Sequence, residues 1–162
     1  MAVKRDDMDA DIRFMKLAFE EALKAEALGE IPIGAVIVID GEVVSKGYNR
    51  VETDKDSTMH AEMIAIRAAE AAVSNSRLIG ATLYVTVEPC SMCAGAAVLA
   101  KISRIVAGTE SDKGGACGTV MNILDCDELN HKVDYTVGIM REECSKLMSD
   151  FFLRLREKRR SS

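Results

Sequence analysis

Apolar positions along the chain follow first a helical and then a strand-like spacing. From Met8 to Leu28 they recur every three to four residues, which predicts an amphipathic helix that ends near Gly29. Residues 34–49 then contain two apolar, β-branched stretches on either side of Asp40-Gly41. Because Asp-Gly between two such stretches is a strong signal for a tight turn, this segment is predicted to be a β-hairpin.

The rest of the chain alternates between helical and extended patterns. Predicted helices cover 60–73, 90–102 and 141–160, predicted strands cover 81–87, 104–108 and 132–139, and a short helix is predicted over 119–125, after a glycine-rich loop at 112–118. A hairpin followed by alternating strands and helices predicts an α/β protein, built as a three-layer α/β/α sandwich around one mixed central sheet.

Length and composition narrow the class of protein. A chain of 162 residues fits one domain, here 1–162, that is large enough to bury a substantial core. No stretch of 18 consecutive apolar residues is present, which argues against a membrane span, and the N-terminal residues lack the apolar segment of a secretory signal. We therefore expect a cytoplasmic protein. Its five cysteines, an odd number, do not suggest a disulfide framework.

The formal net charge of −5 does not suggest nucleic-acid binding, but the charge is unevenly distributed. The C-terminal segment 153–162 has five basic residues and one acidic residue, a net charge of +4, which leaves −9 for the remainder. A basic end of this kind can contact phosphates, but most such ends are only solvated. Charge alone therefore favours a C-terminal segment that is only solvated.

The sequence EPCSMC at 88–93 places two cysteines three positions apart, where a predicted strand is followed by a predicted helix. The helix N-terminus favours the thiolate, and residues three apart share a helix face, so both sulfur atoms can bind one metal ion. A thioredoxin-like redox pair has the same spacing, and the spacing alone favours neither. A zinc ribbon is excluded because Cys117, Cys126 and Cys144 offer no second C-x-x-C; these three are expected to be packed inside.

His60, one of only two histidines, begins the other central helix, and Glu62 follows two residues later. Helix N-termini at the same edge of a sheet lie close together, so His60 is the candidate third ligand beside the cysteine pair, with water in the fourth position. Taken alone, such a histidine is more often a cap or a packed ring, and a first-turn glutamate often only stabilises its own helix. Beside the cysteine pair, Glu62 is the candidate base for that water.

H-x-E followed by P-C-x-x-C is the signature of zinc-dependent nucleobase deaminases. HAE at 60–62 and PCSMC at 89–93 match this signature in order and spacing. In this chemistry zinc makes its water acidic, Glu62 accepts the proton, and hydroxide attacks the ring carbon that carries the amine. Glu62 then passes protons to a ring nitrogen and to the departing ammonia.

Beyond this signature, the chain resembles the bacterial tRNA-specific adenosine deaminases of the cytidine/deoxycytidylate deaminase superfamily. The similar motifs are IPIGAV at 31–36, GYNR at 47–50, HAE at 60–62, TLYVTVEPCSMCAGA at 82–96, GTVMNIL at 118–124, NHKV at 130–133 and SDFF at 149–152. The resemblance implies a cytidine-deaminase-like fold, a homodimer, and one zinc ion per subunit on His60, Cys90 and Cys93, with Glu62 as proton shuttle. It also implies that the wobble adenosine of a tRNA, an arginine tRNA, is converted to inosine.

The resemblance implies substrate contacts as well. These are Asn49 to the flipped nucleoside, the backbone N–H of Ala61 to the base, Asn130 to the anticodon loop, and Phe151 or Phe152 to a splayed base. Phe151 falls on the apolar stripe of the last predicted helix, so Phe152 is the candidate contact. Without the resemblance, Asn49 and Asn130 would be ordinary turn residues.

Two other functions stay open at this point. One is deamination of a free base or nucleotide, such as guanine or cytosine, by the same zinc chemistry; the basic C-terminal segment favours tRNA over these. The other is a noncatalytic RNA-binding or redox module that uses Cys90 and Cys93, against which Glu62 argues because neither role needs a carboxylate there. The resemblance also implies an acidic RNA contact between 109 and 113, to which no residue is assigned.

Overall fold

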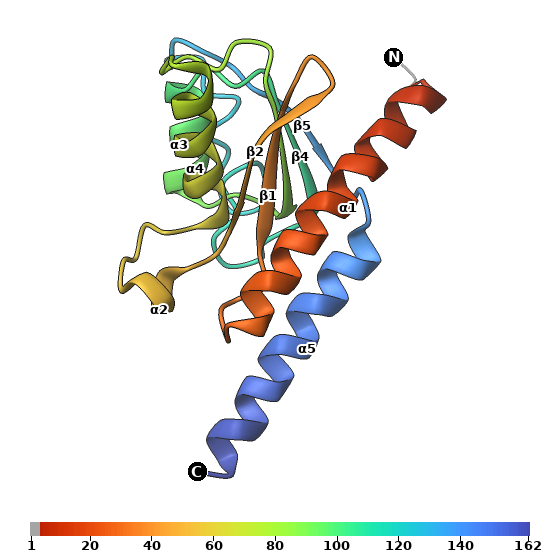
Figure 1. Cartoon of the computed structure of the whole chain (residues 1–162), viewed down its shortest axis with the longest axis vertical. Helices are drawn as coiled ribbons and strands as arrows, with labels where there is room; N and C mark the ends of the chain where they lie inside the picture. Colours follow the sequence, from red (N-terminus) through yellow and green to blue (C-terminus); the bar gives the residue numbers. More distant parts are fainter. Residues whose placement is uncertain (1–3) are drawn as a thin grey trace.

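A mixed five-stranded sheet forms the centre of the structure, a computed structural model that describes residues 4–162 (Figure 1). The strands are β1 (Gly34–Ile39), β2 (Glu42–Tyr48), β3 (Thr82–Val87), β4 (Arg104–Thr109) and β5 (Asp134–Val137). Their order is β2-β1-β3-β4-β5. Strand β1 is antiparallel to both neighbours, whereas β3, β4 and β5 are mutually parallel. The mixed sheet predicted from the sequence is confirmed.

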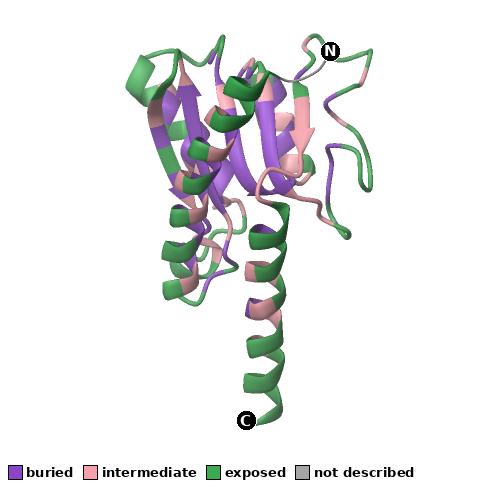
Figure 2. Ribbon diagram, turned by 90° about the vertical axis from the view of Figure 1, so that its right-hand side faces the viewer, coloured by how far each residue is buried: buried purple, intermediate pink, exposed green. Residues whose placement is uncertain are grey.

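Helices cover both faces of this sheet, which confirms the three-layer α/β/α sandwich (Figure 1). On one face lie α1 (Arg5–Ala27) and α5 (Arg141–Arg160), on the other α3 (Ala61–Val73) and α4 (Ser91–Leu99), and α2 (Val51–Asp54) is a single turn between β2 and α3. The C-terminal part of α5 extends past the sheet and is largely exposed (Figure 2). Among residues 4–162, no helix has both the length and the apolar character needed to cross a membrane.

Strand β3 packs against both helical layers. Leu83 and Val85 belong to the buried cluster beneath α3 and α4, whereas Tyr84 belongs to the cluster beneath α1, because successive strand residues point to opposite faces. The Tyr84 hydroxyl donates to Oδ1 of Asp11 in α1 at 2.8 Å, and the Arg104 guanidinium donates to both oxygens of the same carboxylate at 2.9 and 2.8 Å. This buried network fixes α1 across β3 and β4.

The predicted hairpin is confirmed as the β1–β2 connection. Asp40 and Gly41 both have positive φ angles, 51° and 77°, as a type I′ turn requires. Such a turn matches the right-handed twist of the two strands.

The prediction of a short helix over 119–125 is wrong. This segment consists of turns, with one isolated bridge between Cys117 and Asn122. The backbone N–H groups of residues 120 and 121 both bond to the Gly115 carbonyl. These bonds fold the segment back on the preceding glycine-rich loop, so contacts outside the segment decide its conformation.

Candidate active site

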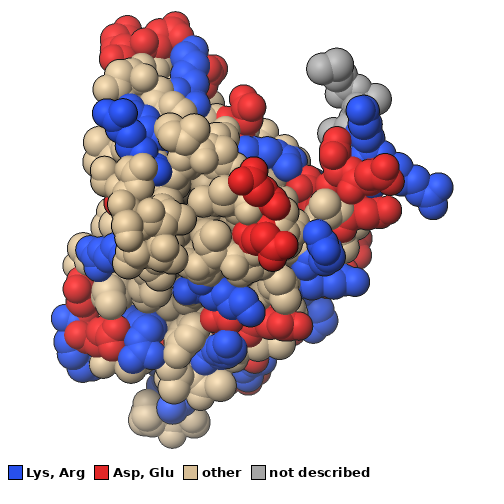
Figure 3. All heavy atoms as spheres, turned by 45° about the horizontal axis from the view of Figure 1, so that its top comes forward, with Lys and Arg blue, Asp and Glu red and all other residues tan. Residues whose placement is uncertain are grey.

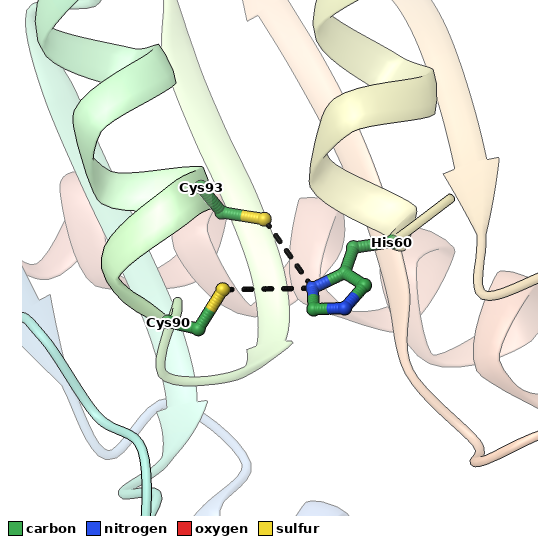
Figure 4. Close-up of side chains that lie close together, drawn as sticks. All are labelled: His60, Cys90 and Cys93. Atoms are coloured by element: carbon green, nitrogen blue, oxygen red, sulfur yellow. Dashed lines mark hydrogen bonds between the residues drawn. The ribbon is translucent and has the colours of Figure 1, made fainter. Parts of the chain in front are cut away.

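Two helix N-termini meet at one edge of the sheet and bring together His60, Cys90 and Cys93 (Figure 4). His60 is the N-cap residue of α3, Cys90 is the N-cap residue of α4, and Cys93 lies in the first turn of α4. The Sγ atoms of Cys90 and Cys93 each lie 3.6 Å from Nδ1 of His60. All three donor atoms lie within 4.8 Å of one another. The juxtaposition expected from the sequence is therefore present.

The donor set and its spacing fit a zinc ion. Tetrahedral zinc with bonds of about 2.3 Å to sulfur and about 2.0 Å to nitrogen separates an N and an S ligand by about 3.5 Å. The two Nδ1–Sγ distances, 3.6 Å each, match this separation. One imidazole and two thiols are also ligands that zinc prefers, and three protein ligands leave one coordination position open.

A glycine on β2 allows α3 to approach closely enough for this arrangement. A Cβ atom at Gly47 would lie 2.5 Å from the carbonyl oxygen of Ala61, the first residue of α3. Any other residue would push the start of α3, and His60 with it, away from the sheet. The N–H of Arg50 also bonds to the carbonyl of Met59 at 3.0 Å, which ties the segment before His60 to the end of β2.

The pKa values of the Cys90 and Cys93 thiols are shifted in opposite directions. A hydrogen bond with Cys93 and the neighbouring His60 lower the pKa of Cys90 to about 3, even though burial opposes its ionisation. The same hydrogen bond and burial raise the pKa of Cys93. The hydrogen bond with Cys90 raises the pKa of His60. Metal binding requires both cysteines as thiolates, so a bound metal ion would displace the protons of this group.

Glu62 is buried beside this group without a complete set of partners. The residue is 3% exposed, and its Oε1 atom has no hydrogen-bond partner among residues 4–162. Burial raises the pKa of the Glu62 carboxyl above its ordinary value. An unpaired buried carboxyl oxygen is costly, so this atom is suited to a proton or to a bound polar ligand.

Asn49 directly follows β2, and Ala61 directly follows the candidate ligand His60 in the chain. Asn49 is buried, and its backbone N–H bonds to the Ile33 carbonyl at 3.1 Å, which fixes it at the end of β2. Ala61 is fully buried in the first turn of α3, where backbone N–H groups have no partner within the helix.

A groove of about 870 Å³ lies between the ends of β3 and β4 and one face of α5. It is lined by Val87, Thr109, Glu110, Ser111, Asp112, Lys113, Arg141, Ser145, Met148, Ser149, Phe152 and Arg156. Phe152 is half-buried and lines the groove, whereas Phe151 is buried and packs edge-on against the Phe152 ring. Asn130 is exposed, accepts a hydrogen bond from Lys101 at 2.8 Å, and is not among the lining residues.

One buried residue beside this groove was missed by the sequence reasoning. Glu88 directly precedes Pro89 and Cys90, and its carboxylate accepts backbone hydrogen bonds from Ser111, Cys117 and Thr119. The sequence signal that could have identified Glu88 is its position directly before Pro89 and Cys90.

The remaining cysteines differ from expectation in one respect: Cys117 and Cys144 are buried, but Cys126 is only half-buried, so the prediction of packing is wrong for Cys126.

Comparison with known proteins supplies independent information. Residues 8–109 match the family described as the cytidine and deoxycytidylate deaminase zinc-binding region. The tRNA-specific adenosine deaminase of Bacillus subtilis (strain 168) is 47% identical over 96% of this chain and 96% of its own length. The tRNA-specific adenosine deaminase of Haemophilus influenzae (strain ATCC 51907 / DSM 11121 / KW20 / Rd) is 44% identical over 93% of this chain and 87% of its own.

Two solved structures share the fold. One comes from work on A-to-I editing by tRNA:A34 deaminases at the wobble position of transfer RNA; it is 41% identical, with a TM-score of 0.81, and the match covers 83% of this chain and 98% of that chain. The other is a guanine deaminase from Nitrosomonas europaea, 21% identical with a TM-score of 0.71 over 93% of each chain. At that identity, the second likeness concerns the fold alone.

Proposed function

The chain belongs to the tRNA-specific adenosine deaminases of the cytidine and deoxycytidylate deaminase family, and we propose that it hydrolyses the wobble adenosine of a tRNA anticodon to inosine and ammonia. The observation that carries the chemistry is the buried Glu62 carboxyl next to the His60, Cys90 and Cys93 group, whose Oε1 has no hydrogen-bond partner among the described residues. A redox pair or a structural metal site has no use for such a group.

The proposed cofactor is one zinc ion per subunit, held by His60 Nδ1 and by the sulfur atoms of Cys90 and Cys93. Their 3.6 Å spacing and their position at two helix N-termini support this ligand set. Bound there, zinc supplies the Lewis acidity that makes water nucleophilic at neutral pH.

Glu62 is the proposed proton shuttle. Burial raises the pKa of the Glu62 carboxyl toward neutral pH. A group whose pKa is closer to the working pH can both accept and donate a proton. Glu62 takes a proton from the attacking water and delivers it to a ring nitrogen of adenine. It then assists the second proton transfer to the exocyclic amine, which leaves as ammonia.

The proposed substrate contacts come from separate segments of the chain. The Asn49 amide and the Ala61 N–H orient the base, since both lie where β2 and α3 meet next to His60. Phe152 offers a half-buried aromatic face in the groove, on which an unstacked base of the anticodon loop can lie. Asn130 would contact the loop from outside the groove, after release of its bond to Lys101.

Charges of both signs are mixed on the surface drawn in Figure 3 and in the groove. On the face seen in Figure 3, basic and acidic side chains are interspersed around a largely uncharged centre. The groove has Lys113, Arg141 and Arg156 beside Glu110 and Asp112. Such a mixed lining favours a defined loop structure over non-specific attraction to phosphates.

The finer assignments are that the substrate is an arginine tRNA, that the enzyme acts in the cytoplasm, and that it is a homodimer. A hollow of about 290 Å³ on α3 and α4 supports the dimer, since Met63, Ala96 and Leu99 line it beside Arg67 and Glu70. Leu99 is 80% exposed in the isolated chain. A second copy packed on this surface would remove it from water.

The decisive experiment uses the zinc-loaded protein and a short anticodon stem-loop with adenosine at the wobble position. We expect inosine in this RNA and no ammonia from guanine or cytidine under the same conditions. Ammonia release from the small molecules alone would contradict the proposal. A stem-loop with adenosine moved one position away from the wobble site is the matched control and should stay unmodified.

A further inference from the structure

The loop from Ser111 to Thr119 folds around one buried carboxylate, that of Glu88. Although charged, Glu88 is only 4% exposed. Its Oε1 accepts the Ser111 N–H at 3.1 Å, and its Oε2 accepts the N–H groups of Cys117 and Thr119 at 3.0 and 3.2 Å. The Thr119 hydroxyl donates to Oε1 as well. One side chain therefore accepts four hydrogen bonds from both ends of the loop.

The middle of the loop is shaped to approach this carboxylate. A Cβ atom at Gly115 would lie 2.5 Å from the carboxyl carbon of Glu88, so a side chain at this position would displace the carboxylate. The N–H of Ala116 bonds to the carbonyl of Pro89 at 2.9 Å, and the N–H of Glu88 bonds to the carbonyl of Thr109 at 2.8 Å. The loop is thereby joined to the segment that leads to Cys90.

The same loop forms one wall of the large groove. Ser111, Asp112 and Lys113 line the groove together with Ser149 and Phe152 of α5. Burying an ionised carboxylate is costly unless several hydrogen bonds offset it. A residue present only to fill space below the loop would be apolar, whereas a carboxylate imposes one defined loop conformation.

We propose that Glu88 is a positioning residue for the RNA substrate: it holds the 111–119 loop as a rigid wall of the groove that receives the anticodon loop. This inference rests on the proposed function, because that function makes the groove an RNA site. Glu88 does not act on the reacting base itself, so its effect belongs to binding rather than to the chemical step.

The test is the substitution Glu88→Gln in the zinc-loaded protein. A glutamine places an NH₂ group against backbone N–H donors and releases part of the loop. We expect the KM for the wobble-adenosine stem-loop to rise about tenfold, as the loss of charge-assisted hydrogen bonds predicts. The kcat and the zinc content should stay close to wild type.

A second readout does not depend on activity. Lys113 is exposed within the loop, and Lys55 is exposed in the separate segment after α2. Limited trypsin digestion of the Glu88→Gln protein should cleave faster after Lys113, with the rate after Lys55 unchanged. The exposed Glu128→Gln variant is the matched control and should behave as wild type in both assays.

The variant Gly115→Ala disturbs the same contact from the loop side and is expected to change KM and cleavage after Lys113 in the same direction. It replaces Glu88→Gln as the test if Glu88→Gln does not fold. Wild-type KM together with wild-type cleavage after Lys113 in the folded variants would overturn the proposal, and so would a lower kcat at unchanged KM. If the wild-type protein leaves the stem-loop unmodified, the proposed function fails, while faster cleavage after Lys113 still reports that Glu88 holds the loop.

Discussion

At the scale of single residues, the site depends on side chains whose environment differs from the usual one for their type. A first-turn glutamate normally points into solvent and stabilises its helix, but Glu62 is 3% exposed, and its Oε1 has no partner in the part of the chain that the structure describes. Phe151 and Phe152 are adjacent in sequence, yet only Phe152 faces the groove. Neighbouring positions on one helix thus have different roles.

The substitution Glu62→Ala should abolish turnover and leave the metal in place, because Glu62 is not one of the three candidate ligands. Loss of a general acid-base group lowers the rate by about 10²–10⁴-fold or more. Zinc content by elemental analysis and inosine formation by nucleoside analysis measure the two quantities separately. Loss of zinc from this variant would contradict the assignment, and Glu142→Gln on the exposed face of α5 serves as the control.

The adjacent phenylalanines should respond in opposite ways. Phe152→Ala should weaken stem-loop binding by about 1–3 kcal/mol, the usual value for a base stacked on an aromatic ring, with little change in unfolding free energy. Phe151→Ala should lower the unfolding free energy by about 3 kcal/mol, because it leaves a cavity under α5. Urea unfolding and a binding titration distinguish the two, and equal effects on binding would refute the assignment.

At the scale of elements, buried carboxylates hold the segments that the sheet does not hold. Glu30, between α1 and β1, is 1% exposed and accepts the N–H groups of Glu52 and Thr53 at 3.1 and 2.7 Å. The Thr53 hydroxyl donates to it at 2.6 Å. These bonds fix the single turn α2, which a four-residue helix could not maintain by itself. Glu88 has the corresponding role for the 111–119 loop.

Stability should fall in acid partly through Glu30. Burial opposes its ionisation, but the hydrogen bonds from Thr53 and Glu52 outweigh burial and lower its pKa below the ordinary 4.5. A lowered pKa in the folded state means that this stabilisation is present above pH 4.5 and is lost as the pH falls through the folded-state pKa.

The variant Glu30→Gln should therefore be less stable than wild type at pH 7 and should lose less stability on acidification. Urea unfolding at pH 7 and at a pH below 4.5 measures the difference. Parallel pH dependences in wild type and variant would show that Glu30 does not contribute. Glu42→Gln, at an exposed position of β2, is the control.

At the scale of the whole molecule, charge and shape are unevenly distributed. The chain has a net charge of −5, but its last ten residues have a net charge of +4. Those residues lie on the part of α5 that extends beyond the sheet (Figure 2). A basic helix end that projects from an acidic body can reach RNA outside the groove without repulsion from the rest of the protein.

Replacing Lys158, Arg159 and Arg160 by glutamine should weaken stem-loop binding and reduce its salt dependence. If each cation neutralises one phosphate, the slope of log K against log salt concentration should decrease in magnitude by about 2–3. Binding titrations at several salt concentrations give this slope. An unchanged slope would mean that the helix end is only solvated, the interpretation that charge alone favours.

The sequence by itself determined the local structure and the chemistry, because both depend on residues close together in the chain. The periodicity of apolar positions predicted the helices and the layered sheet, and the Asp40-Gly41 pair predicted the hairpin. The order and spacing of HAE and PCSMC indicated the deaminase chemistry. Only the tertiary structure decided what depends on contacts between distant segments. The 119–125 segment is not a helix because Glu88, 31 residues away, and the Gly115 carbonyl of the preceding loop bind its backbone. The positions of the α2 turn and the groove wall likewise follow from Glu30 and Glu88, whose partners lie more than 20 residues away. Side-chain periodicity contains no information about such pairings.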